Sequence, residues 1–392
     1  MAFGFGFSFP SFSALRSVGV PSLTLNFMTG LLDSKITFTR SSTATYFDSS
    51  GLVKIAAIDA PRFDYTPDTK VLRGLLVEEA RTNLLNWSQT FATSGGTQNN
   101  WVDSASLQRV STDRISPDGT ANALEIIANA VDQTIRASAA AGSSAQRVFS
   151  VFIKRVTGTG DIQYTLDNGT NWTTQAVTSD WVRYTFAATT ANQQVGIRIR
   201  TSGDSIQIWG AQLETAACPS SYIPTTSASV QRQGDVATVS TLTPWYSATA
   251  GTLYTQFIEF CPDAANNRGI SALDDSTNNN RVAMFVPAGA TLAIASRVVA
   301  GGTATNPANS AVFTANQITK AALAYAVGTN QAALCVNGAT PTTASPAASP
   351  TGVNTLRIGA IFGTTQLGGW VQELKYFNRR LAGSELQSLT TL

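Results

Sequence analysis

The feature that most constrains the fold is a regular rhythm of short strand-like segments separated by turn residues. Segments such as residues 146–155 and 205–214 combine β-branched and aromatic residues with polar ones. Turn residues lie between such segments, and Asn337-Gly338 is a strong signal for a type I′ hairpin. Short strands joined by tight turns are typical of β-sandwiches. The sequence therefore predicts an all-β protein with two β-sandwich (jelly-roll) domains preceded by an extended N-terminal arm.

The order of these segments predicts three units. Residues 1–34 form the arm, residues 35–235 form a β-sandwich with a leading connector segment, and residues 236–392 form a second β-sandwich. Residues 225–234 are rich in Ser, Thr, Gln and Gly, so we expect a polar linker there.

The C-terminal segment predicts how the second sandwich closes. Residues 370–377 alternate apolar and polar side chains, as a strand does. Ser384 and Gln387 then have the spacing of a capping box, and Leu386 and Leu389 form one apolar stripe. We expect a last strand followed by a short helix.

The low charge content excludes several classes of partner. Only 13% of the residues are charged, the net charge is +2, and Lys and Arg form no run. Nucleic acid binding through a basic stripe is therefore not expected. No apolar run reaches the roughly 20 residues that span a bilayer, so we expect no membrane insertion.

The chain contains no histidine. This excludes Ser-His-Asp and Cys-His catalysis and histidine-ligated metal sites. A glycan depolymerase would instead need two neighbouring carboxylates. The strand carboxylates Glu259 and Glu373 are each isolated in sequence, so we predict that the protein is not an enzyme.

The three cysteines, Cys218, Cys261 and Cys335, are far apart and form no CxxC motif. A zinc cluster or a redox dithiol is therefore excluded. The sequence allows either one disulfide or three free thiols. We expect buried free thiols, because thiols stay reduced in a cytosol.

The first residues place five phenylalanines between Gly, Ser and Pro. Alternate residues of an extended chain share one face, so most of these rings would lie together. We interpret the segment as an anchoring arm that binds a partner protein, and a disordered tail is the alternative. The expected partner-binding residues are Phe3, Phe5, Phe7, Phe9 and Phe12.

Three early motifs carry a family resemblance. They are ITFTRSSTATYFD at residues 36–48, APRFD at residues 60–64 and GLLVEEARTNLL at residues 74–85. This set is similar to a segment of tailed-bacteriophage structural proteins, where it precedes a carbohydrate-binding-module-like jelly roll. The C-terminal strand and helix resemble the end of laminin-G-like (concanavalin A-type) domains.

The resemblance implies a bacteriophage virion protein. It would be a tail, baseplate or fibre component that binds host surface carbohydrate, and a capsid decoration protein is the alternative. Made in the host cytoplasm, it would join other virion proteins through its arm. By analogy with phage appendages, we expect a homo-oligomer such as a trimer.

Sugar sites need aromatic faces for stacking and amides or carboxylates for the hydroxyls. Trp101 lies in a polar loop beside Asn100, and Trp172 follows a hairpin turn beside Asn171. We predict that these four residues bind carbohydrate. Two other tryptophans, at positions 209 and 370, lie in alternating strands and are expected in the core.

Residues 274–280 (DDSTNNN) are dense in oxygen ligands. Laminin-G-like domains often bind Ca²⁺ at one rim, so Asp274 and Asp275 are the residues that would share a calcium ion. The spacing does not match an EF-hand loop, and a solvated hairpin loop is the interpretation that we favour. No other cofactor is expected.

Overall fold

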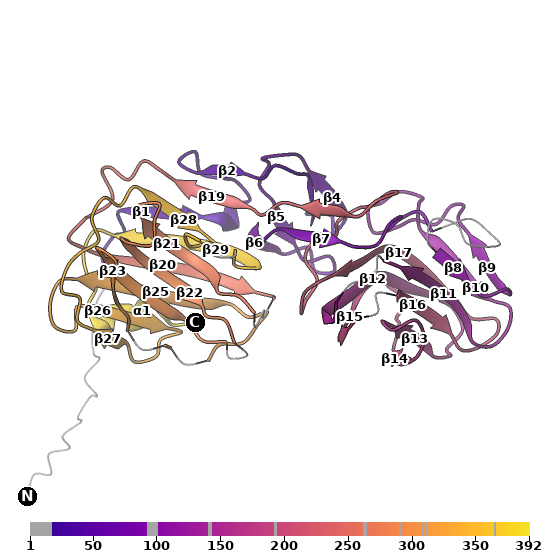
Figure 1. Ribbon diagram of the computed structural model, residues 1–392. Helices are drawn as coiled ribbons and strands as arrows, with labels where there is room; N and C mark the ends of the chain where they lie inside the picture. Colours follow the sequence, from indigo (N-terminus) through magenta and orange to yellow (C-terminus); the bar gives the residue numbers. More distant parts are fainter. Residues whose placement is uncertain are drawn as a thin grey trace, which may run out of the picture.

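The computed structural model describes residues 18–91, 101–139, 143–191, 194–261, 265–289, 292–307, 309–310, 312–363 and 366–392. Strands arranged in antiparallel sheets dominate these residues, with one short 3₁₀ helix and one α-helix. The predicted all-β class is therefore confirmed. Figure 1 shows two sandwiches side by side, with the N-terminal segment running along both. None of the helices in the described ranges is long and apolar enough to cross a membrane.

The middle sandwich consists of two five-stranded sheets, and its core lies between them. The strand order of the first sheet is β15 (Val182–Thr190), β12 (Ala145–Thr157), β17 (Ser205–Glu214), β10 (Leu124–Ala128) and β9 (Leu107–Val110). The strand order of the second sheet is β14 (Thr173–Gln175), β13 (Ile162–Thr165), β16 (Gln194–Ile199), β11 (Gln133–Ser138) and β8 (Trp101–Asp103). Alternating burial along β15 and β11 gives each of these strands one apolar face toward the core.

The C-terminal sandwich is larger. The strand order of its first sheet is β27 (Thr342–Ala344), β26 (Ala332–Val336), β25 (Thr319–Ala326), β20 (Ala250–Glu259), β29 (Gly369–Phe377), β6 (Leu72–Val77) and β5 (Phe63–Tyr65), with β1 (Leu23–Asn26) also paired to β29. The strand order of its second sheet is β2 (Thr37–Thr39), β19 (Val236–Val239), β28 (Thr355–Ile358), β21 (Arg268–Asp274), β22 (Arg281–Val286), β23 (Ala295–Ala300) and β24 (Thr303–Thr305).

The N-terminal segment is part of the C-terminal sandwich, which corrects the predicted boundary at residue 34 and the assignment of residues 35–77 to the middle unit. Strand β1 pairs with β29, and Leu23 and Leu25 are buried in the main core. Strands β2, β5 and β6 also join the two C-terminal sheets. The middle sandwich is therefore inserted between two parts of the chain that build one core. The five phenylalanines of the predicted arm lie outside the described residues.

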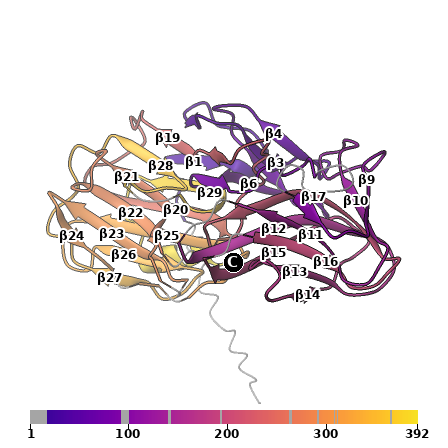
Figure 2. The same ribbon diagram turned by 45° about the vertical axis from the view of Figure 1, so that its right-hand side comes forward.

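Two small sheets connect the sandwiches. The hairpin of β3 (Ala44–Phe47) and β4 (Val53–Ala56) packs against an aromatic cluster of the middle sandwich that includes Phe152 and Trp209. Strand β18 (Val230–Arg232) pairs with β7 (Arg81–Asn83), so part of the predicted linker is held in a sheet. Figure 2 shows β3, β4 and β6 between β29 and β17.

The end of the C-terminal sandwich follows the prediction with one correction. Helix α1 (Gly383–Thr390) follows β29 as expected. The cap of α1 is formed by Glu385, whose carboxylate accepts a 2.8 Å hydrogen bond from Ala382 N–H, and not by Ser384. A short 3₁₀ helix, η1 (Phe27–Thr29), follows β1 near the other end of the chain.

Candidate functional site

Trp101 is buried, so the prediction that it stacks on sugar is wrong. Its side chain has no exposed surface and packs edge to face on Phe91, with ring centroids 4.8 Å apart. The indole Nε1 donates a 3.2 Å hydrogen bond to Trp87 O. Trp101 begins strand β8 and lies in the core, where burying a tryptophan stabilises the sandwich. Asn100 lies outside the described residues.

Trp172 and Asn171 lie together on the predicted hairpin, where both side chains have partners. The Arg198 guanidinium carbon lies 4.5 Å from the centroid of the half-buried Trp172 ring. Asn171 is exposed, but its Nδ2 donates to Asp167 at 2.7 Å and braces the turn. A sugar would have to displace or share the Arg198 face, so carbohydrate binding here stays a prediction.

The two predicted calcium ligands have separate sets of partners. The Asp274 carboxylate is buried and accepts hydrogen bonds from Arg357 Nε at 2.7 Å and Nη2 at 3.1 Å. Asp275 accepts from Thr277 and from Asn280 Nδ2 at 2.9 Å. Across the described ranges, the structure places no three His, Cys, Asp or Glu residues where they could hold one metal ion. The geometry therefore gives the calcium prediction no support.

A cleft between the two sandwiches is the best-formed candidate site. It has a volume of about 380 Å³ and is roofed by the β3–β4 hairpin. The C-terminal sheet, the middle sandwich and the loop after β17 supply its other walls. Aromatic, charged and hydroxyl side chains line the cleft, among them those of Thr45, Tyr46, Phe47, Asp64, Arg73, Glu78, Phe152, Arg183, Ser220, Ser221, Phe260 and Trp370.

The C-terminal wall of the cleft is organised around Trp370. Its Nε1 donates a 2.9 Å hydrogen bond to Asp64 Oδ2, and Phe47 N–H donates to Asp64 Oδ1 at 2.7 Å. The Arg73 guanidinium stacks on the indole, 4.1 Å from the ring centroid. Burial raises the pKa of Asp64 to about 6, although the two hydrogen bonds and Arg73 act in the opposite direction.

The stacked guanidinium of Arg73 makes no hydrogen bond or ion pair with the described residues. The nearby Asp64 carboxylate raises the pKa of Arg73, but the larger effect of burial lowers it. Because the ordinary pKa of arginine is so high, the group remains a cation at neutral pH. The cleft therefore contains a positioned guanidinium whose donors the described residues leave unused.

The opposite wall carries a second arginine. Arg183 Nη1 donates to Ser220 O at 2.8 Å, and Nη2 donates to Ser150 Oγ at 2.9 Å. Its guanidinium lies over Phe152, 5.6 Å from the ring centroid. Its Nε is buried and has no hydrogen-bond partner. Burial lowers the pKa of Arg183, and Glu214 opposes that effect.

Glu78 lines the cleft and connects two of its walls through an ion pair and hydrogen bonds. Its carboxylate lies 2.7 Å from Arg62 Nη1 and 3.6 Å from Arg232 Nη2. Ser221 donates to it from both N–H and Oγ at 2.7 Å. Burial alone would raise the pKa of Glu78, but Arg232, Arg62 and the Ser221 hydrogen bonds together lower it to about 2.

The ion network extends behind Glu78 to Asp235. Arg62 Nη2 lies 2.5 Å and Arg40 Nη1 lies 3.0 Å from the Asp235 carboxylate, and all three side chains are fully buried. Arg40 and Arg62 come from the connector, and Asp235 directly follows the segment predicted to be a linker. Both segments help to hold the structure together, because each supplies buried charges that would be costly to bury without the opposite charges of the other segment.

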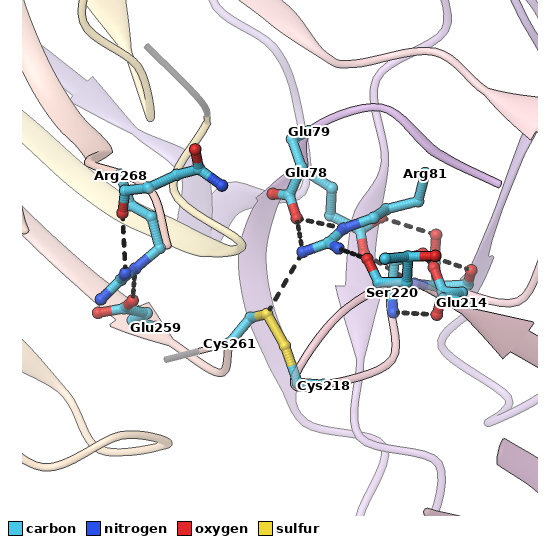
Figure 3. The surroundings of a disulfide bond; sticks show 12 residues. Glu78, Glu79, Arg81, Glu214, Cys218, Ser220, Glu259, Cys261 and Arg268 are labelled. Carbon is cyan, nitrogen blue, oxygen red and sulfur yellow. Dashed lines mark hydrogen bonds and ion pairs between the residues drawn. A yellow bond between two sulfur atoms is a disulfide. The ribbon is translucent and has the colours of Figure 1, made fainter. Parts of the chain in front are cut away.

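A disulfide joins the sandwiches beside this network, which corrects the expectation of free thiols. Cys218 follows β17 of the middle sandwich and Cys261 follows β20 of the C-terminal sandwich, with Cα atoms 5.5 Å apart. Cys335 is the buried free thiol. Figure 3 shows the bond between the Glu78, Arg81 and Ser220 group on one side and the Glu259–Arg268 pair on the other. The spacing of the cysteines gave no signal for this pairing, because 43 residues separate them.

The two strand carboxylates named for a depolymerase form separate ion pairs. Glu259 pairs with Arg268, and Glu373 pairs with Lys375 at 2.7 Å. Burial raises the pKa of Glu259 to about 7, and Arg268 acts in the opposite direction. These two residues do not form the carboxylate pair that glycoside hydrolysis requires.

Sequence reasoning missed the cleft because its residues are scattered along the chain. They come from residues 45–78, from 152–222, and from Phe260, Asn316 and Trp370. The sequence did hold one pointer to the cleft, namely the three motifs that carry the family resemblance. Residues 36–48 contain Thr45 to Phe47, residues 60–64 contain Asp64, and residues 74–85 contain Leu76 and Glu78, all of which line the cleft. Trp209 and Trp370 are buried, as expected.

Comparisons with known proteins identify no family. No family model matches the sequence, and no curated protein is a significant match. Among solved structures, the CBM40 domain of the Ruminococcus gnavus IT-sialidase bound to α2,3-sialyllactose is 16% identical, with a TM-score of 0.32; the match covers 37% of this chain and 84% of that chain.

Two other solved structures resemble larger parts of the chain. Mouse laminin α1 domains LG4-5 are 8% identical with a TM-score of 0.27, covering 66% of this chain and 88% of that chain. A tail fibre protein from a phage of E. coli is 10% identical with a TM-score of 0.20, covering 78% of this chain and 41% of that chain. At such identities, these likenesses concern the fold alone.

Proposed function

We propose that the protein binds carbohydrate in the cleft between its sandwiches, as a non-enzymatic component of a bacteriophage virion. The observation that carries the proposal is the make-up of the cleft wall. Aromatic rings at Tyr46, Phe47 and Phe260 lie beside the fixed polar groups of Asp64 and Arg73. Rings for C–H stacking next to positioned hydrogen-bonding groups are what a sugar site needs.

The virion part of the proposal is supported by where the resembling motifs lie. Residues 36–48 form β2 and β3, residues 60–64 carry Asp64, and residues 74–85 form β6 and β7. The segments similar to phage structural proteins are therefore the ones that build the cleft and join the sandwiches. A tail, baseplate or fibre component fits a protein that contacts host glycan, and capsid decoration is the alternative.

The state of the carboxylates favours binding over hydrolysis. Asp64 and Glu78 are the acidic residues that line the cleft. Both oxygens of Glu78 are held by Ser221, with Arg62 alongside, so this carboxylate is not available to attack or protonate a glycosidic bond. A lone carboxylate at Asp64 does not supply the pair that glycosidases use.

A glycan array followed by calorimetry tests the proposal. We expect binding that falls by about tenfold in Tyr46→Ala, since an aromatic contact contributes on the order of 1 kcal/mol beyond its area. Tyr46→Phe keeps the ring and is the matched control, and Trp172→Ala reports on the hairpin site. Binding lost in Trp172→Ala and kept in Tyr46→Ala would move the site to the hairpin.

The position of the protein in the particle is a separate test. Cryo-EM density at the tail tip or baseplate supports host adhesion, whereas density on the capsid lattice supports decoration. Anchoring through the arm predicts that deletion of residues 2–13 removes the protein from the particle. Its retention after that deletion would refute the anchoring role of the five phenylalanines.

A further inference from the structure

The hydrogen-bonding capacity left over in the cleft is unequal between donors and acceptors. Both oxygens of Asp64 accept hydrogen bonds from the protein, and so do both oxygens of Glu78. The guanidinium of Arg73 donates to none of the described residues, and Arg183 Nε has no partner although it is buried. Among the charged groups that line the cleft, those left without a hydrogen-bond partner among the described residues are therefore donors, on Arg73 and on Arg183.

The guanidinium of Arg73 is also held in a fixed orientation. It lies 4.1 Å from the centroid of the Trp370 ring, and Trp370 is itself fixed by the hydrogen bond from its Nε1 to Asp64. A guanidinium stacked on a ring keeps its N–H donors in one plane, directed outward from its edges. That fork matches the two oxygens of a carboxylate. A freely rotating surface arginine would lose more conformational entropy on binding.

We propose that the ligand of the cleft is an acidic saccharide whose carboxylate pairs with the guanidinium of Arg73. The inference rests on the proposed carbohydrate binding and names its ligand class. The sugar ring lies against the cleft aromatics, and its carboxylate takes the Arg73 donors that the described residues leave open. Arg183, on the opposite wall, adds positive potential. Hydrogen bonds between charged groups are the strong ones, so this contact accounts for much of the affinity.

The test uses an array of oligosaccharides that contain hexuronic or nonulosonic acids, each printed beside its methyl ester, together with neutral and sulfated sugars. We expect at least one acid to bind and its ester to bind at least tenfold more weakly. Arg73→Gln should abolish that difference, and Arg73→Lys, which keeps the charge without the fork, should retain only part of it. Arg136→Gln, an arginine replacement on the second sheet of the middle sandwich, is the matched control.

Each outcome bears on the inference. An acid preference that is lost in Arg73→Gln, with an unchanged unfolding midpoint, supports it. Equal binding of acid and ester, an acid preference that survives Arg73→Gln, or a preference for sulfated over carboxylated sugars overturns it and leaves carbohydrate binding in place. Absence of binding to every sugar on the array overturns both proposals.

Discussion

Replacement of Glu78 with glutamine would remove one negative charge from the base of the cleft while nearly preserving the shape of the side chain. In the protein, that charge faces Arg62 and Arg232, all three groups being buried. Without it, Arg62 would keep its ion pair with Asp235, whereas Arg232 would keep only hydrogen bonds to the Gln233 and Glu79 carbonyls among the described residues. We expect Glu78→Gln to lower the free energy of unfolding substantially at neutral pH.

The pKa of Glu78 sets the magnitude. Folding lowers it from an ordinary 4.5 to about 2, because the arginines and Ser221 outweigh the effect of burial. At about 1.4 kcal/mol per pKa unit, the ionised carboxylate contributes about 3 kcal/mol at pH 7. A lowered folded-state pKa means that this stabilisation is present above pH 4.5 and is lost as the pH falls toward 2. At pH 3, about 1 kcal/mol should remain.

Urea denaturation of the two proteins at pH 7 and pH 3 measures this difference. The difference between wild type and Glu78→Gln should shrink from about 3 to about 1 kcal/mol. Glu373→Gln is the matched control, since its ion pair with Lys375 is partly exposed and should contribute less than about 1 kcal/mol. A difference below about 1 kcal/mol at pH 7, or one that is equal at both pH values, would refute the reasoning.

Three further predictions concern the disulfide, the buried tryptophan and the cleft carboxylate. Replacing Cys218 and Cys261 with serine should cost about 4 kcal/mol, because the bond closes a loop across 43 residues; a loss below about 1 kcal/mol in non-reducing urea titrations would contradict this. Trp101→Ala should destabilise the protein by about 3–5 kcal/mol and leave glycan preference unchanged, because the ring fills the core. Loss of glycan binding without loss of stability would instead return Trp101 to the binding site. Affinity for a carboxylated sugar should rise several-fold as the pH falls through about 6, since protonation of Asp64, which faces Arg73 and Arg62, removes a repulsive charge. Calorimetry of Asp64→Asn, in which the rise should vanish, checks the assignment.

Local sequence patterns predicted the elements of this protein well. Residues 205–214 were expected to be a strand, and β17 has these bounds; residues 146–155 were also expected to be one, and they lie within β12. The Asn337-Gly338 turn was also predicted, and both residues have positive φ. These successes share one cause, because alternation and turn chemistry act between neighbours in the chain.

The failures concern contacts between distant parts of the chain. The predicted boundary at residue 34 ignored β1, because nothing in residues 23–26 indicates that β29 is their partner. Trp101 was expected on the surface because its neighbours are polar, yet its own burial outweighs their preference. The cleft needs Asp64, Arg73 and Trp370 together, and no local pattern links these positions.

The pairing of β1 with β29 has a consequence for the order in which the protein is made. The Ser22 hydroxyl donates a hydrogen bond to Tyr376 O, 354 residues further along the chain, so β1 cannot pair with β29 until residue 376 has left the ribosome. The middle sandwich has its own core and could form earlier. Until β29 is made, β1 and β6 lack the strand with which they pair, and such non-local sheets assemble slowly. Because the cleft needs β6 and Trp370, binding competence should arise only after Trp370 has left the ribosome, later than the folding of the middle sandwich.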